Sequence, residues 1–334
     1  AKGSLPKIIA GSDEVLTALF ERTYAALTPC AQQVFLTLAS WNSAVPRIAL
    51  ETVLMVSIEE PLEVEKAIDN LIQYSMIEEK KSVMDGQYFV GLPYVALAFG
   101  AKKVGVSPLK SRIKRDSKLL QTFGPCKLED KSISFRHHFI SYLRNINLME
   151  FEKQKAIIDR VCFSFNEGYV LVSNLLFESG ESKLVSLSKE YCLLFLENEL
   201  KNDNKIEGWK LLSEISKQLK EPLDEVHAIL EMAQLSTTDF FELSTIVNTV
   251  NHKLFTKQLE LEDTSVKTEL LSDLYSVLWR RRNEGGAIDF SRVAWLALHL
   301  NKTNDAKQLV GEGLKLDSHN SYCIKLQKKL ETLK

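Results

Sequence analysis

The sequence of 334 residues is poor in glycine and proline, the residues that chains use most at turns. Together they account for 22 residues, less than the share of about 12% that average usage gives. Long helices with short connections need few such residues, so the shortage predicts a mostly all-α fold. It excludes an all-β protein, and it also excludes a doubly wound α/β enzyme, which needs a glycine-rich first turn.

Cysteine pairs and long apolar runs are also missing. The five cysteines are widely spaced and form no CxxC motif, which is typical of reduced thiols in a cytoplasmic protein. No run of 18 apolar residues occurs, so we expect no membrane partner. The segment Ala1 to Ser12 lacks the apolar core of a signal peptide. The absent initiator Met leaves two interpretations, which are removal of Met or excision from a longer protein.

Motifs for nucleotide binding and catalysis are incomplete. The stretch Gly100 to Ser107 resembles a phosphate-binding loop, but Val106 occupies the position of the essential lysine, and the stretch follows a predicted helix instead of a strand. His137 and His138 are adjacent, so on a helix they point about 100° apart and cannot chelate a metal together. We therefore expect no catalytic residue, no cofactor and no metal in this chain, and no binding or hydrolysis of ATP.

The first third of the chain predicts three helices followed by a β-hairpin. Thr28 and Pro29 are an N-cap and a first helical residue, and Asp85-Gly86 joins two short extended runs. The three helices are expected at 29–41, 47–56 and 60–74, the extended runs at 76–82 and 87–92, and a further helix at 94–103. This order is the winged-helix layout. We assign 28–104 to a winged-helix domain and 1–27 to a linker and helix that lead from an absent upstream domain.

The rest of the chain, 105–334, predicts helices alone. Their expected ranges are 108–122, 131–146, 149–163, 166–178, 184–200, 206–219, 223–235, 237–258, 264–282, 287–300, 303–316 and 319–333. Helices of this length with short links favour a stack of antiparallel pairs.

One helix pair aligns with the tetratricopeptide repeat. On 287–320, small residues fall where two helices of such a repeat pack closely, and Asn301 falls at the turn between them. The predicted packing positions are Ala294, Ala297, Ala306 and Gly313. We therefore predict a tetratricopeptide-like superhelical array over 105–334, whose groove would bind a protein or peptide ligand.

Charge divides the chain into regions with different expected partners. The third helix of the winged-helix domain, 59–74, has five acidic residues against Lys66 alone, so it should repel DNA phosphates. A basic stretch follows, with a net charge of +6 over 17 residues. It is interpreted either as a solvated helix face or as a surface for an acidic partner, with nucleic acid as the less favoured partner. Its members are Lys102, Lys103, Lys110, Arg112, Lys114, Arg115 and Lys118.

Two segments of the chain resemble a known family. The run from Asp13 to Leu16 and on through Leu27-Thr28-Pro29 to Leu36 resembles the junction between the nucleotide-binding core and the winged helix of STAND-class P-loop ATPases. The run Tyr88 to Val95 is similar to a later element of the same winged helix, with Leu92 in place of a nucleotide-sensing histidine. In that family, a helical-repeat array commonly follows and acts as the ligand sensor.

The resemblance implies a regulatory role. The chain would be the sensor portion of a bacterial signalling protein, with its ATPase domain upstream in the same parent chain, and some relatives of this type act in defence against phage. Ligand binding to the repeats would release the winged helix, permit ADP to exchange for ATP and lead to oligomerisation. Two alternatives remain open, a winged-helix transcription regulator with a repeat-type regulatory domain and a stand-alone peptide-binding scaffold.

Overall fold

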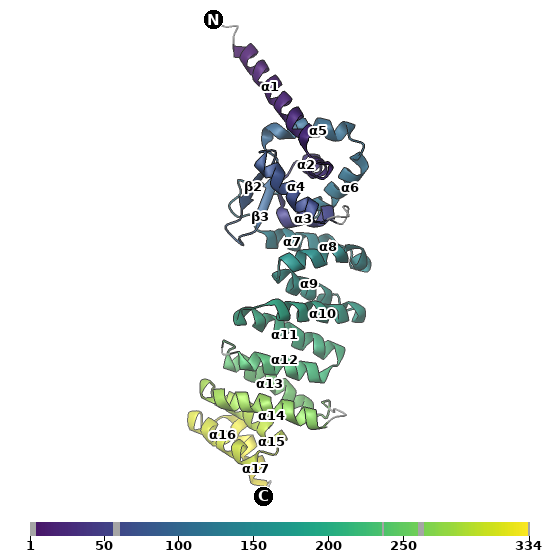
Figure 1. Cartoon of the computed structure of the whole chain (residues 1–334). Coiled ribbons are helices and arrows are strands. Elements are labelled where there is room, and N and C mark those ends of the chain that lie inside the picture. The colour runs from purple at the N-terminus through teal and green to yellow at the C-terminus, as the bar shows by residue number, and fades with distance from the viewer. Residues whose placement is uncertain (1–4, 56–60, 236, 260–263, 333–334) are drawn as a thin grey trace. The chain divides into compact units, whose positions relative to one another are not determined.

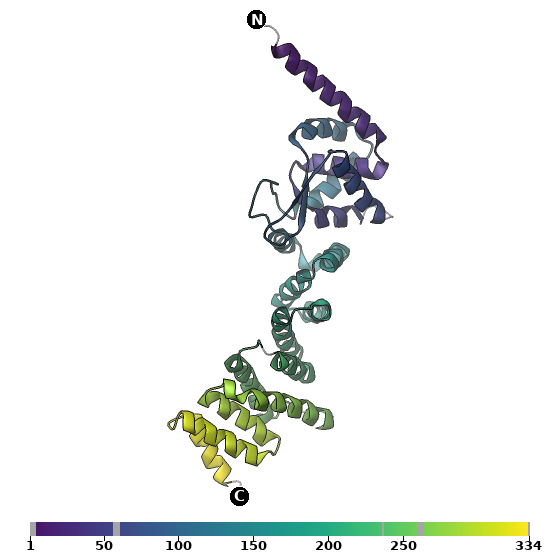
Figure 2. The same ribbon diagram turned by 60° about the vertical axis from the view of Figure 1, so that its left-hand side comes forward.

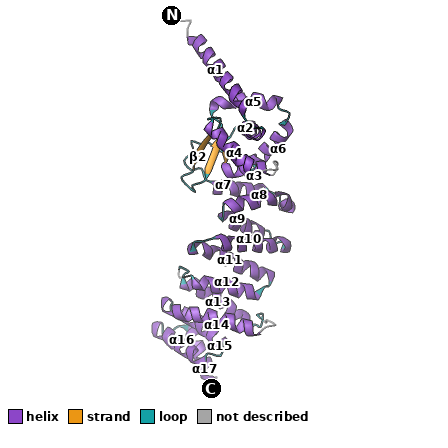
Figure 3. Cartoon of the chain, in the orientation of Figure 1, coloured by secondary structure: helices purple, strands orange, loops and turns teal. Residues whose placement is uncertain are grey.

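The protein is mostly helical, with one small β-sheet, as the computed structural model shows (Figure 1; Figure 3 colours the chain by secondary structure). The structure describes residues 5–55, 61–235, 237–259 and 264–332. The chain divides into two compact units, Ala1–Gly168 and Tyr169–Lys334. The expectation of a mostly all-α fold is confirmed. None of the described helices combines the length and the apolar character needed to cross a membrane.

The first unit contains the sheet and the helices around it. In chain order its elements are α1 (Leu5–Ala26), α2 (Pro29–Trp41), β1 (Val45–Pro46), α3 (Arg47–Met55), α4 (Pro61–Gln73), β2 (Glu78–Lys81), β3 (Tyr88–Gly91), α5 (Tyr94–Val106), α6 (Lys110–Gln121), α7 (Phe135–Asn145) and α8 (Phe151–Ser164). The helix α9 (Glu167–Glu178) begins in the last two residues of this unit and continues in the second one.

The second unit continues with helices alone in its described part. They are α10 (Ser182–Asn198), α11 (Asn202–Leu219), α12 (Pro222–Gln234), α13 (Phe240–Phe255), α14 (Thr264–Arg281), α15 (Ala287–His299), α16 (Thr303–Leu316) and α17 (Ser321–Thr332). Every helix predicted after residue 105 is present as one of α6–α17, with bounds that differ by a few residues.

The sheet has three strands where the sequence predicts two. β3 lies in the centre and pairs antiparallel with β2 on one side and with β1 on the other, where Val45 lies opposite Val90. The sequence predicts no strand between the helices at 29–41 and 47–56, so β1 is an addition to the prediction. Proline is tolerated in an edge strand, because its nitrogen can face away from the neighbouring strand, where no N–H is needed for a hydrogen bond of the sheet. The predicted turn is present, with Gly86 at φ +71°.

The helix α2 forms the centre of the first unit. Thr28 caps it by accepting a hydrogen bond from the Ala31 N–H, and Pro29 opens its first turn, as predicted. Its buried residues Val34, Phe35 and Leu38 face α4, α5 and α6. The order of three helices and a hairpin that the winged-helix assignment needs is thus present. The winged-helix assignment itself stays a prediction.

The stretch that resembles a phosphate loop is part of the helix α5. Gly100 lies where α5 crosses α2, and a Cβ at this position would come within 2.5 Å of the Ala39 Cβ. Gly105, by contrast, has open space around it. The first glycine of the stretch therefore permits two helices to pack closely.

Helices of the second unit pack mainly against neighbours one or two places along the chain. α12 packs on α11 and α14, α13 packs on α15, and α15 packs on α16 and α17. Figure 1 and Figure 2 show these helices following one another in chain order. This local pattern of contacts is the one expected of a stacked helical array.

The four small residues predicted to mark close helix packing lie in the core of this unit. Ala294, Ala297 and Ala306 have no exposed surface. A Cβ at Gly313 would come within 2.8 Å of the Cys323 Sγ and 3.3 Å of the Phe290 Cβ. Asn301 has the left-handed φ of 59° that the predicted turn requires. The tetratricopeptide assignment itself stays a prediction.

Ala306→Leu is expected to lower the melting temperature of the chain. The added atoms have no room, and overpacking of this kind typically costs about 1–3 kcal/mol. Lys307→Leu adds a leucine at the next position, which is exposed, and it should change stability far less. Thermal unfolding followed by circular dichroism compares the two, and equal shifts would mean that the alignment of this helix pair is wrong.

Candidate functional site

The predicted basic surface separates into two groups in the structure. Lys102 and Lys103 belong to α5, and the other five residues belong to α6. Lys103 forms an ion pair with Glu21, with an N–O distance of 2.7 Å, and its ammonium lies over the ring of Phe99. The guanidinium of Arg115 pairs with the buried Asp116 at 3.2 Å. Those two cations have internal partners. The remaining ones, Lys102, Lys110, Arg112, Lys114 and Lys118, form no ion pair with any residue that the structure describes.

A second surface, on the helical array, is formed by α13, α15 and α17. The helix α15 is buried on most sides and exposes one stripe, which runs along positions spaced by three or four residues. α13 and α17 pack on either side of α15 and extend this stripe. We call the combined surface the aromatic face. Its members are Phe241 and Thr245 of α13, Ile288, Arg292, Trp295 and His299 of α15, and Tyr322, Lys325 and Lys329 of α17.

Cations lie over aromatic rings across both helix boundaries of the aromatic face. The guanidinium of Arg292 is 5.2 Å from the ring centre of Phe241, and the ammonium of Lys329 is 4.1 Å from that of Trp295. Such contacts are attractive because the face of the ring is negative. Arg292 also donates hydrogen bonds to Ser244 and Thr245. The three helices are therefore held in register at this surface.

The aromatic face combines exposed apolar area with positive charge. Phe241 and Tyr322 are each 57% exposed, and Ile288 is 39% exposed. No member of the face is acidic. Burial lowers the pKa of His299, and the nearby Lys329 and Lys267 lower it further. Arg292 pairs with the buried Asp289, whereas Lys325 and Lys329 form no ion pair with any residue that the structure describes.

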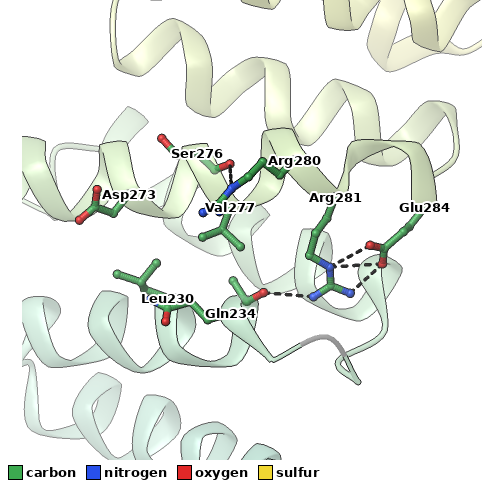
Figure 4. A pocket seen from close by; sticks show the side chains of 9 residues that line it. Leu230, Gln234, Asp273, Ser276, Val277, Arg280, Arg281 and Glu284 are labelled. Carbon is green, nitrogen blue, oxygen red and sulfur yellow. Dashed lines mark hydrogen bonds and ion pairs between the residues drawn. The ribbon is translucent and has the colours of Figure 1, made fainter.

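A hollow of this unit lies between α12 and α14 (Figure 4). It has a volume of about 640 Å³, with buried Leu230, Ala233 and Val277 on its floor and the exposed Asp273 and Arg280 at its rim. Opposite charges and a small apolar floor suit a short polar ligand better than a broad protein interface.

Arg281 forms one wall of this hollow. Its guanidinium pairs with Glu284 (Figure 4). It also donates to the carbonyl oxygens of Ala233 and Leu235, both at 3.1 Å, and to that of Thr238. These carbonyls lie at and beyond the end of α12, where helical hydrogen bonds run out. Arg281 is therefore a structural cap that joins α14 to α12.

Burial and hydrogen bonding lower the reactivity of three cysteines and of His138 in the described chain. Burial raises the pKa of Cys126 and of Cys192 to about 12, and that of Cys323 to about 11, so these thiols stay protonated and are poor nucleophiles. His138 is bound through Nδ1 to the Phe123 carbonyl at 2.7 Å. No group of three or more potential metal ligands gathers among the described residues.

Comparison with known proteins provides no family assignment. No protein-family model matches the chain, and no curated protein or solved structure matches it either.

Proposed function

We propose that this chain is a regulatory, protein-binding region and that it binds an acidic segment of a partner protein on the aromatic face. One observation carries the proposal. Exposed aromatic and aliphatic side chains from three helices contribute to this face, with cations over two of its rings and no exposed carboxylate among its members. Trp, Tyr and Arg are the residues most enriched where protein interfaces gain their affinity.

The charge of the face indicates the chemistry of the partner. Lys325 and Lys329 form no ion pair with residues in the described part of the chain, and the carboxylate that pairs with Arg292 belongs to the buried Asp289. An acidic side chain of a partner would find the ammonium groups of Lys325 and Lys329, the second of which lies over the ring of Trp295. Apolar side chains of the same partner segment would cover Phe241 and Tyr322.

The arrangement of elements supports a wider role for this binding surface. Three helices and a hairpin precede a helical array, the order found in the sensor portion of STAND-class ATPases, which residues 13–36 and 88–95 resemble. We propose that the array senses the partner and that the first unit transmits binding to an ATPase domain of the same parent protein, in signalling or in defence against phage. The acidic residues Glu63, Glu65 and Asp69 on α4 favour this role over that of a transcription regulator. Glu59 and Glu60, the other two acidic residues of the helix predicted at 59–74, lie outside the described residues.

Selection of a random peptide library on the whole chain tests the proposal. We expect enriched peptides to carry acidic residues beside apolar ones. Trp295→Ala and Tyr322→Ala should each weaken their binding about 30-fold, the effect of losing about 2 kcal/mol at an interface hot spot. Lys329→Glu should shift the selection away from acidic peptides.

Arg280→Ala is the matched control, because it removes an exposed cation from the hollow between α12 and α14 of the same unit. It should leave binding unchanged. Loss of binding in Arg280→Ala, with no effect of Trp295→Ala, would instead assign the ligand to the hollow and contradict the role of the aromatic face.

A further inference from the structure

The outward face of α6 carries a line of exposed lysines, of which Lys110 donates a hydrogen bond to the Gly105 carbonyl at 3.5 Å. Lys110, Lys114 and Lys118 are spaced by four residues, and all three are exposed. With a rise of 1.5 Å per residue, their positions follow one another about every 6 Å along one side of the helix. None of the three forms an ion pair with any described residue. The opposite side of α6, with Ile113, Asp116, Ser117 and Leu120, is buried.

This arrangement works against the stability of α6 itself. Like charges spaced by four residues repel each other, at a cost of about 0.2–0.5 kcal/mol for each pair. The first turn of α6 contains Lys110 and Arg112 and no acidic residue, so its cations lie at the positive end of the helix dipole. The N-cap residue Leu109 supplies no side-chain hydrogen bond. Sequences break local rules of this kind most often at functional sites.

The composition of this face indicates which of two partners it suits, an acidic protein or a nucleic acid. A protein interface gains its affinity from buried apolar and aromatic anchors. The outward positions of α6 are instead Lys110, Ser111, Lys114, Arg115 and Lys118, all of them polar. The exposed Val106 and Leu109 lie before the first turn of α6 and not along this line. Phosphate groups of a nucleic acid need cations and no apolar anchor.

From these observations we infer that the α6 face binds the phosphate backbone of duplex nucleic acid without regard to sequence. Duplex is favoured over single strands, because α6 presents no aromatic side chain on which unpaired bases could stack. Binding does not use the winged-helix position of α4, whose carboxylates would repel phosphates. The inference goes beyond the proposed protein partner and concerns the other unit of the chain.

Fluorescence anisotropy with a short labelled DNA duplex of random sequence tests the inference on the whole chain. If three phosphates are contacted, the logarithm of the affinity should fall with the logarithm of the salt concentration with a slope of about −2.7. Affinity should thus drop about 40-fold between about 50 and about 200 mM salt. The triple variant Lys110→Glu, Lys114→Glu, Lys118→Glu should lose binding at the lower salt concentration.

A control with the same change in net charge is Lys183→Glu, Lys201→Glu, Lys307→Glu, three exposed positions of the second unit. It should bind the duplex like the parent chain, and both triple variants should keep the parent's circular dichroism spectrum. The inference is overturned if the two triple variants lose affinity equally, if the parent chain binds polyglutamate but not the duplex, or if binding is sequence-selective and is lost when α4 is altered. Trp295→Ala should leave duplex binding unchanged, which separates this test from that of the aromatic face.

Discussion

Replacing Lys253 by methionine is expected to lower the free energy of unfolding by about 3–5 kcal/mol, the usual cost of removing one partner from a buried ion pair. Lys253 of α13 donates to both carboxylate oxygens of Glu225 on α12, with 2.6 Å to Oε1. The side chain of Glu225 is only 4% exposed. Methionine fills the space of the lysine stem but leaves the carboxylate buried without its cation.

Urea denaturation followed by circular dichroism measures this loss, with two comparisons. The double variant Lys253→Met, Glu225→Gln removes both charges and should recover most of the stability, because no isolated buried charge remains. Lys217→Met breaks the exposed pair with Glu214 and should change stability by less than about 1 kcal/mol. A loss in Lys253→Met no larger than in Lys217→Met would show that Glu225 does not depend on this partner.

The two glycines of the stretch that resembles a phosphate loop should respond in opposite directions to alanine. Gly105→Ala is expected to stabilise the chain by up to about 1 kcal/mol, because alanine is the better helix former and no atom lies within 4 Å of the new Cβ. Gly100→Ala has the same gain in propensity, but its Cβ would lie 2.5 Å from the Ala39 Cβ. That atom is fixed to the backbone of α2, so the two helices must separate.

Comparison of the two variants isolates the cost of forcing α2 and α5 apart, which we expect to be about 1–3 kcal/mol. The readout is the difference in urea midpoint between Gly100→Ala and Gly105→Ala at unchanged slope. Similar midpoints would mean that α5 can move away from α2 freely. Titration with ATP should give no response in either variant, because neither glycine is expected to contact phosphate.

Local sequence patterns predict most of the helices but not every strand. Two adjacent residues mark the start of α2. Thr28 accepts a hydrogen bond from the N–H of Ala31, and Pro29 fixes its own φ angle, so both signals can be recognised from the local sequence alone. β1 was missed because Val45 and Pro46 are too few to show an alternating pattern. The strand exists because Val45 pairs with Val90, which is far away in the sequence.

The candidate sites, too, can be predicted from the sequence only where their residues lie on one helix. The lysine line of α6 could be read from the sequence because it lies on one helix. Its neighbours Lys103 and Arg115 were assigned to the same surface, but Lys103 pairs with Glu21 on another helix and Arg115 with the buried Asp116. The aromatic face was missed, because Phe241, Trp295 and Lys329 come from three helices. The spacing of Arg292, Trp295 and His299 along α15 was its only signal within one helix.

The neighbour-by-neighbour packing of the second unit has a consequence for how it folds. Its main contacts join helices one or two places apart along the chain, so few long loops must close before native contacts form, and such topologies fold rapidly. Stability is then close to a sum of terms from adjacent helices. A partner bound across α13, α15 and α17 would couple the terms of all five helices from α13 to α17 and make this end of the array unfold as a single cooperative block.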